Sequence, residues 1–188
     1  MNEFAGYDVL SFGEADRDSL LASGLSFASY APPATRHHED VDPRGKLHVE
    51  NQGRLSSCVG HGVSTACETV GCFQRGSFDG VPQLSRWFAY RMGQKVWGQE
   101  GRDQGCTIQA GVDSAKKYGV CREEVCPYPS AFNFNPIPKT AIDDAAHFKI
   151  QHHVPLQDDC QQWVNFLDGG FGAIVIGVLW TSRMGQSR

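Results

Sequence analysis

Apolar side chains recur at the spacing of an α-helix in three separate stretches between residues 58 and 119. Serine, threonine or proline residues, which are frequent at helix N-termini, precede each stretch. A glycine that can end a helix follows the third stretch. The pattern predicts three helices: the first after Ser56 and Ser57 to about Phe73, the second from Pro82 or Ser85 with Leu84, Trp87, Phe88, Met92 and Val96 on one face, and the third from Thr107 to Gly119.

The pattern changes after residues 130–140, which are rich in Asn and Pro and which we interpret as a linker. Apolar and polar residues alternate from Phe148 to Leu156, as they do in a half-buried strand. A continuous apolar run at 173–180 is typical of a fully buried strand. Between these two segments, Asp158 or Asp159 can cap a short helix that ends at Gly169 and Gly170. Four side chains of this helix are expected to point inward: Cys160, Trp163, Val164 and Leu167.

These elements indicate an α+β protein in which a helical half is followed by a β half. We assign residues 1–40 to an N-terminal arm and residues 41–188 to one domain of ordinary size. The helical half is expected at 41–130 and the start of the β half at 141–188. Because an isolated pair of strands is marginal in water, we expect the antiparallel β half to be incomplete. A second polypeptide segment would then complete it.

Charge and hydropathy argue against several classes of partner. The net charge is −4 and the basic residues form no cluster, which argues against nucleic acid. No apolar run approaches the ~20 residues that span a bilayer, so we expect no membrane partner. The N-terminus is acidic and lacks the features of a secretory signal. We therefore expect a cytoplasmic protein, or a component of a particle such as a virion.

Cys58 differs from the other six cysteines because it falls in the first turn of the first predicted helix. The positive end of the helix dipole and the unpaired N–H groups there favour a thiolate, which is the reactive form of cysteine. Gln52 lies six residues upstream, and its side-chain amide can donate a hydrogen bond to an oxyanion beside the sulfur. The alternative is a buried structural cysteine that opens a core helix.

The residues around Cys58 resemble the signature of the papain-like cysteine peptidases. The loop reads Val-Glu-Asn-Gln-Gly at 49–53 and is followed by Ser-Ser-Cys at 56–58, with the family's spacing of six between Gln and Cys. The family's Asp-x-Arg is present upstream as Asp-Pro-Arg at 42–44. Leu55 replaces a half-cystine common in animal and plant members, which resembles the bacterial and phage branches. Val59 replaces an aromatic residue that often follows the nucleophile.

The resemblance implies a papain-like fold, with a long central helix in the helical half and an antiparallel β half. It implies that Cys58 is the nucleophile, that Gln52 stabilises the oxyanion, that the substrate is a polypeptide and that no cofactor is needed. The family's base His and its orienting Asn lie ~130–150 residues beyond the Cys, so we expect the base to come from outside this chain. His61, three residues after Cys58 on the same helix face, is a further candidate base, although that position in the family is buried and non-catalytic.

Two hypotheses follow from this resemblance. The first is a thiol protease that forms an acyl-enzyme on Cys58, with its base His supplied by another polypeptide segment. The second is a catalytically inactive papain-like module that serves as a structural or interaction part of a larger assembly, such as a virion.

A zinc site is the remaining alternative for the cysteines. Cys121 and Cys126 share a predicted loop and could both bind one metal ion. Cys67 and Cys72 lie five residues apart on one predicted helix, so their side chains diverge. Because no second convergent pair accompanies Cys121 and Cys126, we expect no metal site. Without a secretory signal, we expect the thiols to be reduced.

Overall fold

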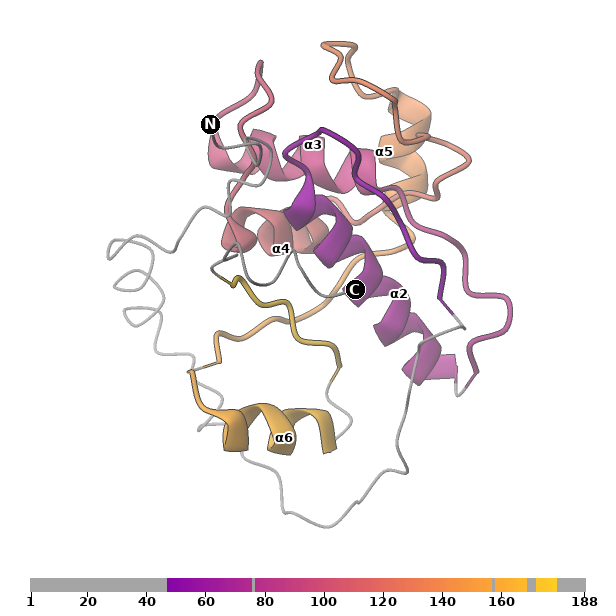
Figure 1. Ribbon diagram of the computed structural model, residues 1–188. Coiled ribbons are helices and arrows are strands. Elements are labelled where there is room, and N and C mark those ends of the chain that lie inside the picture. The colour runs from indigo at the N-terminus through magenta and orange to yellow at the C-terminus, as the bar shows by residue number, and fades with distance from the viewer. Residues whose placement is uncertain (1–46, 76, 157, 169–171, 179–188) are drawn as a thin grey trace, which may run out of the picture.

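The computed structural model describes residues 47–75, 77–156, 158–168 and 172–178. Within these residues the chain forms five helices, shown in Figure 1: α2 (Cys58–Arg75), α3 (Arg86–Trp97), α4 (Ile108–Lys117), α5 (Lys139–Ala145) and α6 (Cys160–Asp168). The predicted N-terminal arm at 1–40 and the Asp-Pro-Arg at 42–44 lie outside the described residues. None of the described helices is long and apolar enough to cross a membrane.

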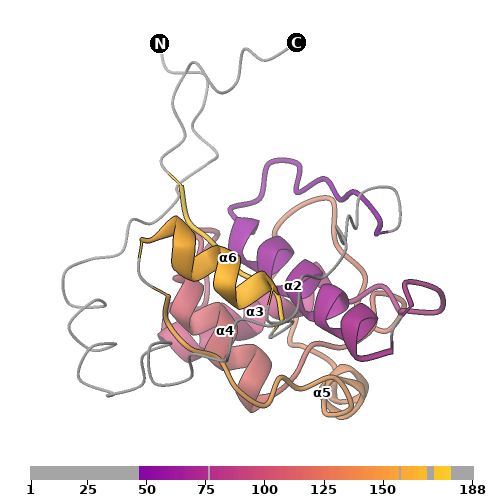
Figure 2. The same ribbon diagram turned by 90° about the horizontal axis from the view of Figure 1, so that it is seen from below.

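The three helices predicted from hydrophobic periodicity are α2, α3 and α4, and their expected starting points are confirmed. The Ser85 hydroxyl accepts a hydrogen bond from the N–H of Phe88 at 3.0 Å. The Thr107 hydroxyl accepts one from the N–H of Ala110 at 3.1 Å. Both are N-cap contacts that satisfy a first-turn donor. The three helices pack against one another in both views (Figures 1 and 2).

Two glycines allow the N-terminal half of α2 to approach its neighbours closely. A Cβ atom on Gly60 would lie 2.6 Å from the backbone oxygen of Arg86 in α3. A Cβ atom on Gly111 in α4 would lie 2.5 Å from Cγ1 of Val59 in α2. These glycines cost helix propensity but permit backbone-to-backbone approach. The first turns of α2 are therefore held between α3 and α4.

The core continues from α3 into the segment that follows α4. The N–H of Ser85 donates to the carbonyl of Cys121 at 2.7 Å, and Leu84 and Arg122 form an antiparallel β-bridge, the one β pairing within the described residues. This contact places residues 120–132 along the side of α3 and next to the start of α2. The buried cluster between them consists of Leu55, Trp87, Phe88, Tyr90, Met92, Cys106, Cys121, Cys126, Ala141 and Ala145, with Tyr128 and Phe132 packed against it.

The short helix α5 was missed by the sequence analysis, which expects a linker up to residue 140. Its seven residues show no apolar periodicity, and its N-cap, Pro138, offers no side-chain acceptor. Tertiary contacts hold it instead. Arg122 donates to the Asp144 carboxylate from Nη2 at 2.7 Å and from Nε at 3.0 Å. The predicted helix end, Gly119, has φ +87° and approaches the carbonyl of Ala145 so closely that a side chain there would clash.

Both predicted strands are wrong within the described residues. The chain at 149–156 and at 172–178 forms no strand ladder. Ile176 and Val178 are 54% and 44% exposed, although the apolar run predicts full burial. A β-strand is defined by its hydrogen bonds to a neighbouring strand, and no segment among the described residues forms such bonds with 149–156 or 172–178. The last two residues of the predicted strand, 179 and 180, lie outside the described residues.

The predicted short helix after Asp159 is present as α6, but its orientation differs from the prediction. Asp159 accepts a hydrogen bond from the N–H of Gln161 at 2.9 Å, as expected of a capping residue. Cys160 is exposed, and Val164 and Leu167 are each 51% exposed, so these three side chains do not face a core. In Figure 1, α6 lies apart from α2, α3 and α4, below them. Trp163 and Phe166 on the same helix are partly buried.

Candidate functional site

Cys58 is the first residue of α2, as predicted, and Ser57 occupies the N-cap position. The carbonyl of Ser57 accepts the N–H of His61 at 3.1 Å. The Ser57 hydroxyl is fully buried and bonds to the Tyr128 hydroxyl at 2.5 Å rather than to a first-turn N–H. The N–H groups of Cys58 and Val59 are directed at the Cys58 sulfur. The start of α2 therefore presents backbone donors to the thiol.

The charge state of Cys58 differs from the sequence expectation. Burial of the half-buried Cys58 side chain raises the pKa of its thiol above the ordinary value, and this effect exceeds the lowering by the N–H groups of Val59 and Cys58. Burial disfavours the anion because the protein interior solvates charge poorly. The helix N-terminus alone therefore does not make Cys58 a thiolate. A cationic group beside the sulfur is needed to lower its pKa.

Tyr128 joins the loop before α2 to the helix itself. Its hydroxyl donates to the carbonyl of Gln52 at 3.0 Å and also bonds to Ser57, as noted above. The N–H of Tyr128 donates to the Glu123 carboxylate at 2.6 Å, which fixes the backbone on the other side. Burial raises the pKa of the Tyr128 hydroxyl, so it is a neutral donor at physiological pH. One hydroxyl thus sets the distance between the Gln52 loop and the N-terminus of α2.

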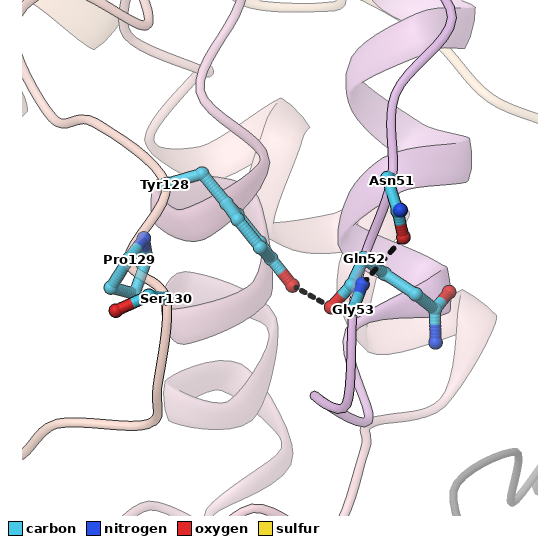
Figure 3. Close-up of a pocket in the computed structure, with 6 residues that line it drawn as sticks. All are labelled: Asn51, Gln52, Gly53, Tyr128, Pro129 and Ser130. Atoms are coloured by element: carbon cyan, nitrogen blue, oxygen red, sulfur yellow. Dashed lines mark hydrogen bonds between the residues drawn. The ribbon is translucent and has the colours of Figure 1, made fainter.

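The side chain of Gln52 turns away from Tyr128, as Figure 3 shows. Its Nε2 donates to the carbonyl of Leu55 at 3.0 Å, across the turn that precedes α2. An amide nitrogen carries two N–H donors. The second donor of Gln52 has no acceptor within the described residues, and it can serve an oxyanion.

A shallow pocket of about 330 Å³ lies between the Gln52 loop and the segment that carries Tyr128 (Figure 3). The turn at its rim is held by Asn51, whose side-chain oxygen accepts the N–H of Gly53 at 2.8 Å. The lining is mostly polar, and it consists of Asn51, Gln52, Gly53, Tyr128, Pro129 and Ser130.

Asp103 holds the loop immediately before Cys58. Its carboxylate accepts the N–H of Ser56 at 2.9 Å and the hydroxyl of Tyr90 at 2.7 Å. Burial, followed by the bond to Asp103, raises the pKa of Tyr90, which therefore stays protonated and donates. The sequence analysis missed both Asp103 and Tyr128. They lie 47 and 71 residues from their partners in the loop, and no local pattern links residues so far apart.

A buried ionic cluster fixes the upstream part of the loop. The guanidinium of Arg86 is fully buried and lies 3.2 Å from Glu50 and 3.3 Å from Glu68. Glu68 also accepts the N–H of Leu84 at 2.7 Å, and burial raises the pKa of its carboxyl. Removal of one member would leave a buried charge without its partner. Glu50, two residues before Gln52, is thereby tied to both α2 and α3.

His61, the in-chain candidate base, is directed at Ser57. Its Nδ1 lies 3.1 Å from the carbonyl of Ser57, and its ring stands edge-on to Tyr128 at 4.9 Å. The Nε2 atom is buried without a hydrogen-bond partner in the described residues. Burial lowers the pKa of His61, so the ring is neutral at physiological pH. Within the described residues, no histidine shares a hydrogen bond or ion pair with Cys58.

His153, Cys121 and Cys126 have other partners in the described residues. His153 lies 3.2 Å from the Asp113 carboxylate and 3.1 Å from the Gln109 amide, both on α4. In the part of the chain that the structure describes, no cluster of three or more His, Cys, Asp or Glu side chains could hold a metal ion. Cys121 and Cys126 are buried in the core beside α3.

The chain matches no model of a known protein family and no curated protein sequence. Among solved structures, it is similar to xylellain, a cysteine protease from Xylella fastidiosa. The TM-score is 0.60 at 20% identity, and the match covers 90% of this chain and 61% of the xylellain chain. The fold is papain-like. The predicted fold class is thus confirmed, with α2 as the long central helix.

This similarity establishes the fold alone, since only 20% of the aligned residues are identical. The chain spans less than two thirds of the length of xylellain. A second match is to a chain from a structural study of antibody cross-reactivity between the mite allergens Blo t 1 and Der p 1. Its TM-score is 0.47 at 12% identity, and it covers 89% of this chain and 56% of that one.

Proposed function

We propose that this chain carries the nucleophile and the oxyanion donors of a papain-like cysteine peptidase that hydrolyses peptide bonds. The observation that carries the proposal is the position of Cys58 at the first residue of α2 in a papain-like fold, with the N–H groups of Cys58 and Val59 directed at its sulfur. Donors placed where negative charge develops stabilise a transition state without reorganisation.

In the proposed reaction, the Cys58 thiolate attacks the carbonyl carbon of a substrate peptide bond. The second N–H of the Gln52 amide and the backbone N–H of Cys58 hold the oxyanion of the tetrahedral intermediate. An imidazolium protonates the leaving amine, and a water molecule then hydrolyses the acyl-enzyme. Tyr128 and Asp103 act as positioning residues, because they hold the loop that connects Gln52 to Cys58.

The base is proposed to lie on a polypeptide segment beyond the 188 residues of this chain. Two observations support this. His61 donates its Nδ1 proton to a backbone carbonyl, and burial keeps the Cys58 pKa high in the absence of a neighbouring cation. The same segment would complete the β half, where Ile176 and Val178 are exposed. An imidazolium beside the sulfur would favour the thiolate.

The second candidate function is a papain-like module that binds without catalysis, as a structural part of a larger assembly such as a virion. The neutral, protonated state of Cys58 favours it. Under either proposal we place the protein in the cytoplasm or in such a particle. Leu55, in place of a half-cystine, supports a relationship to the bacterial and phage branches of the family.

The test is chemical rescue of peptide hydrolysis by free imidazole. Without imidazole, we expect the purified chain to turn over a fluorogenic peptide mixture slowly. Turnover should rise with imidazole concentration, because Cys58 is only partly buried and a small base can approach its sulfur from solvent. Cys58→Ala should abolish the rescued activity, and Cys160→Ala, which removes an exposed cysteine, should leave it intact.

Each alternative has its own result in this assay. Turnover that survives Cys58→Ala contradicts the peptidase mechanism. Turnover that is independent of imidazole but lost in His61→Ala identifies His61 as the base. No acyl-enzyme at any imidazole concentration, in a protein with intact helicity, supports the inactive module.

A further inference from the structure

The ring of Tyr118 brings together lysines from two helices. Lys95 is in the last turn of α3, and Lys117 is in the last turn of α4. Their Nζ atoms lie 5.9 and 5.1 Å from the centre of the Tyr118 ring, close enough for cation–π contact. Because α3 and α4 pack side by side in both views (Figures 1 and 2), cations from the ends of both helices reach the same ring.

Two further lysines lie beside this pair. Lys116 precedes Lys117 in the last turn of α4. Lys149 reaches the end of α4 from the segment after α5, since a Cβ atom built on Gly119 would lie 3.2 Å from its Cγ. All four lysine side chains are exposed. We call Lys95, Lys116, Lys117 and Lys149 the lysine cluster.

The lysine cluster has no acidic partner within the described residues. None of its four side chains forms an ion pair there, whereas the other described lysine, Lys139, pairs with Asp143 at 2.6 Å. Asp113 and Asp144, the acidic residues nearest to the cluster in the sequence, pair with other side chains. The cluster is therefore a region of uncompensated positive charge on a chain whose net charge is −4.

The dipoles of α3 and α4 account for part of this arrangement. The C-terminal end of a helix is negative and favours cations, which suits the three lysines in the last turns of α3 and α4. Lys149 belongs to neither helix. Four like charges without a counter-charge repel one another, and an acidic ligand would remove that repulsion.

The chain itself contains a segment of complementary charge. Residues 1–20 hold five acidic side chains and one basic side chain: Glu3, Asp8, Glu14, Asp16, Asp18 and Arg17. We propose that this acidic segment, residues 3–18, docks on the lysine cluster of the same molecule. The proposal does not rest on the peptidase reaction, because no lysine of the cluster is hydrogen-bonded to Cys58 or Gln52 in the described residues.

The connection between the acidic segment and the described fold is long enough for this contact. Residues 19–46 join the two, and a fully extended chain of that length spans up to about 90 Å. A globular protein of this size has a radius of gyration of about 16 Å. The acidic segment can therefore reach the lysine cluster wherever residue 47 lies on the surface.

The primary test is zero-length cross-linking of the unmodified chain with a water-soluble carbodiimide. The reagent joins a carboxylate to a lysine amine as an amide and takes up the water that is lost. At low ionic strength, peptide mapping should show links from residues 3–18 to the lysine cluster. In about 1 M NaCl, where the Debye length is about 3 Å, these links should disappear. In an equal mixture of unlabelled and isotopically labelled chain, each link should join peptides of the same label.

Lys139 is the internal control for this experiment, because it is exposed and already paired with Asp143. The proposal is overturned when residues 3–18 link to Lys139 as often as to the lysine cluster, since such links report random collisions. It is equally overturned when no link to the cluster forms. Links between labelled and unlabelled chains also contradict it, because they place the acidic segment on a second copy.

A charge variant of the full chain tests whether the acidic segment occupies the cluster. Glu14→Gln/Asp16→Asn/Asp18→Asn removes three of the five carboxylates and should leave the cluster free. We expect a fluorescently labelled peptide with the native sequence of residues 1–20 to bind this variant at least about 3-fold more tightly than the unmodified chain, as measured by fluorescence anisotropy. Equal binding to the two proteins contradicts the proposal.

The site of binding is tested by two matched lysine substitutions in the same charge variant. Lys117→Gln/Lys149→Gln removes two charges of the cluster at exposed positions and should weaken binding of the labelled peptide at least about 2-fold. Lys139→Gln removes a charge outside the cluster and should leave binding unchanged. Circular dichroism checks that both proteins keep their helicity. A loss of binding in Lys139→Gln that matches the loss in the cluster variant overturns the proposed site.

Discussion

Replacement of Tyr128 by Phe removes one oxygen atom and leaves the aromatic ring in place. The hydroxyl makes two hydrogen bonds, to Ser57 and to Gln52, each worth about 0.5–1.5 kcal/mol net. Ser57 is fully buried, and its hydroxyl would keep only the 3.4 Å contact with His61. The carbonyl of Gln52 would keep the N–H of Leu55 at 3.3 Å. We therefore expect Tyr128→Phe to lower the free energy of unfolding by about 1–3 kcal/mol.

Urea unfolding, followed by circular dichroism, measures this loss as a lower midpoint with an unchanged m value. Tyr118→Phe is the matched control. The Tyr118 hydroxyl makes no hydrogen bond within the described residues, and its ring contacts Lys95 and Lys117, which Phe can retain. We expect the control to change stability by less than about 0.5 kcal/mol. Equal midpoints for the two variants would show that the Tyr128 hydroxyl does not join the loop to α2.

Three further predictions follow from the packing and the charges. Gly60→Ala should lower the free energy of unfolding by about 1–3 kcal/mol, because its Cβ would lie 2.6 Å from a backbone oxygen of α3. Gly62→Ala, whose Cβ would meet its nearest neighbour at 3.5 Å, should raise it by up to about 1 kcal/mol in the same urea assay. The side chain of Arg122 lowers the pKa of Asp144, so this pair stabilises the fold above the ordinary carboxyl pKa of about 3.9. The free energy of unfolding that this ion pair contributes is lost as pH falls through the lowered pKa of Asp144. Unfolding curves of Asp144→Asn, measured at several pH values, should therefore lose less stability in acid than those of the unmodified protein. The rate at which iodoacetamide labels Cys58 should keep rising above the pH at which an ordinary thiol is fully ionised, because burial raises the pKa of Cys58. A rate that is already constant near neutral pH would contradict this prediction.

The features that could be predicted from sequence are those whose cause lies within one helical turn. Ser85 and Thr107 cap the helices that follow them, because the acceptor and the N–H it satisfies are three residues apart. The apolar spacing from Val59 onward placed Cys58 at the start of α2, although the Ser57 hydroxyl before it bonds to Tyr128 and not to a first-turn N–H. The papain-like fold was predicted from the resemblance of residues 49–58 to the signature of that family.

The features that could not be predicted depend on contacts between distant residues. Tyr128 and Asp103 stabilise the Cys58 loop from 71 and 47 residues away. The apolar run at 173–178 describes what these side chains prefer, and not whether a neighbouring strand is present to pair with them. The sign of the Cys58 pKa shift was also missed. Its position in α2 is local, whereas the burial that raises the pKa comes from the surrounding fold.

The raised pKa of Cys58 and the exposed apolar residues of the β half lead to the same requirement. Backbone donors at the start of α2 can stabilise a thiolate, but they do not outweigh burial. A cation within ~4–6 Å of the sulfur would add the missing stabilisation. Ile176 and Val178 are exposed, and His61 already donates to the carbonyl of Ser57. One additional segment that pairs with residues 173–178 and carries an imidazole would satisfy both needs, so activation of the nucleophile and completion of the β half would occur together.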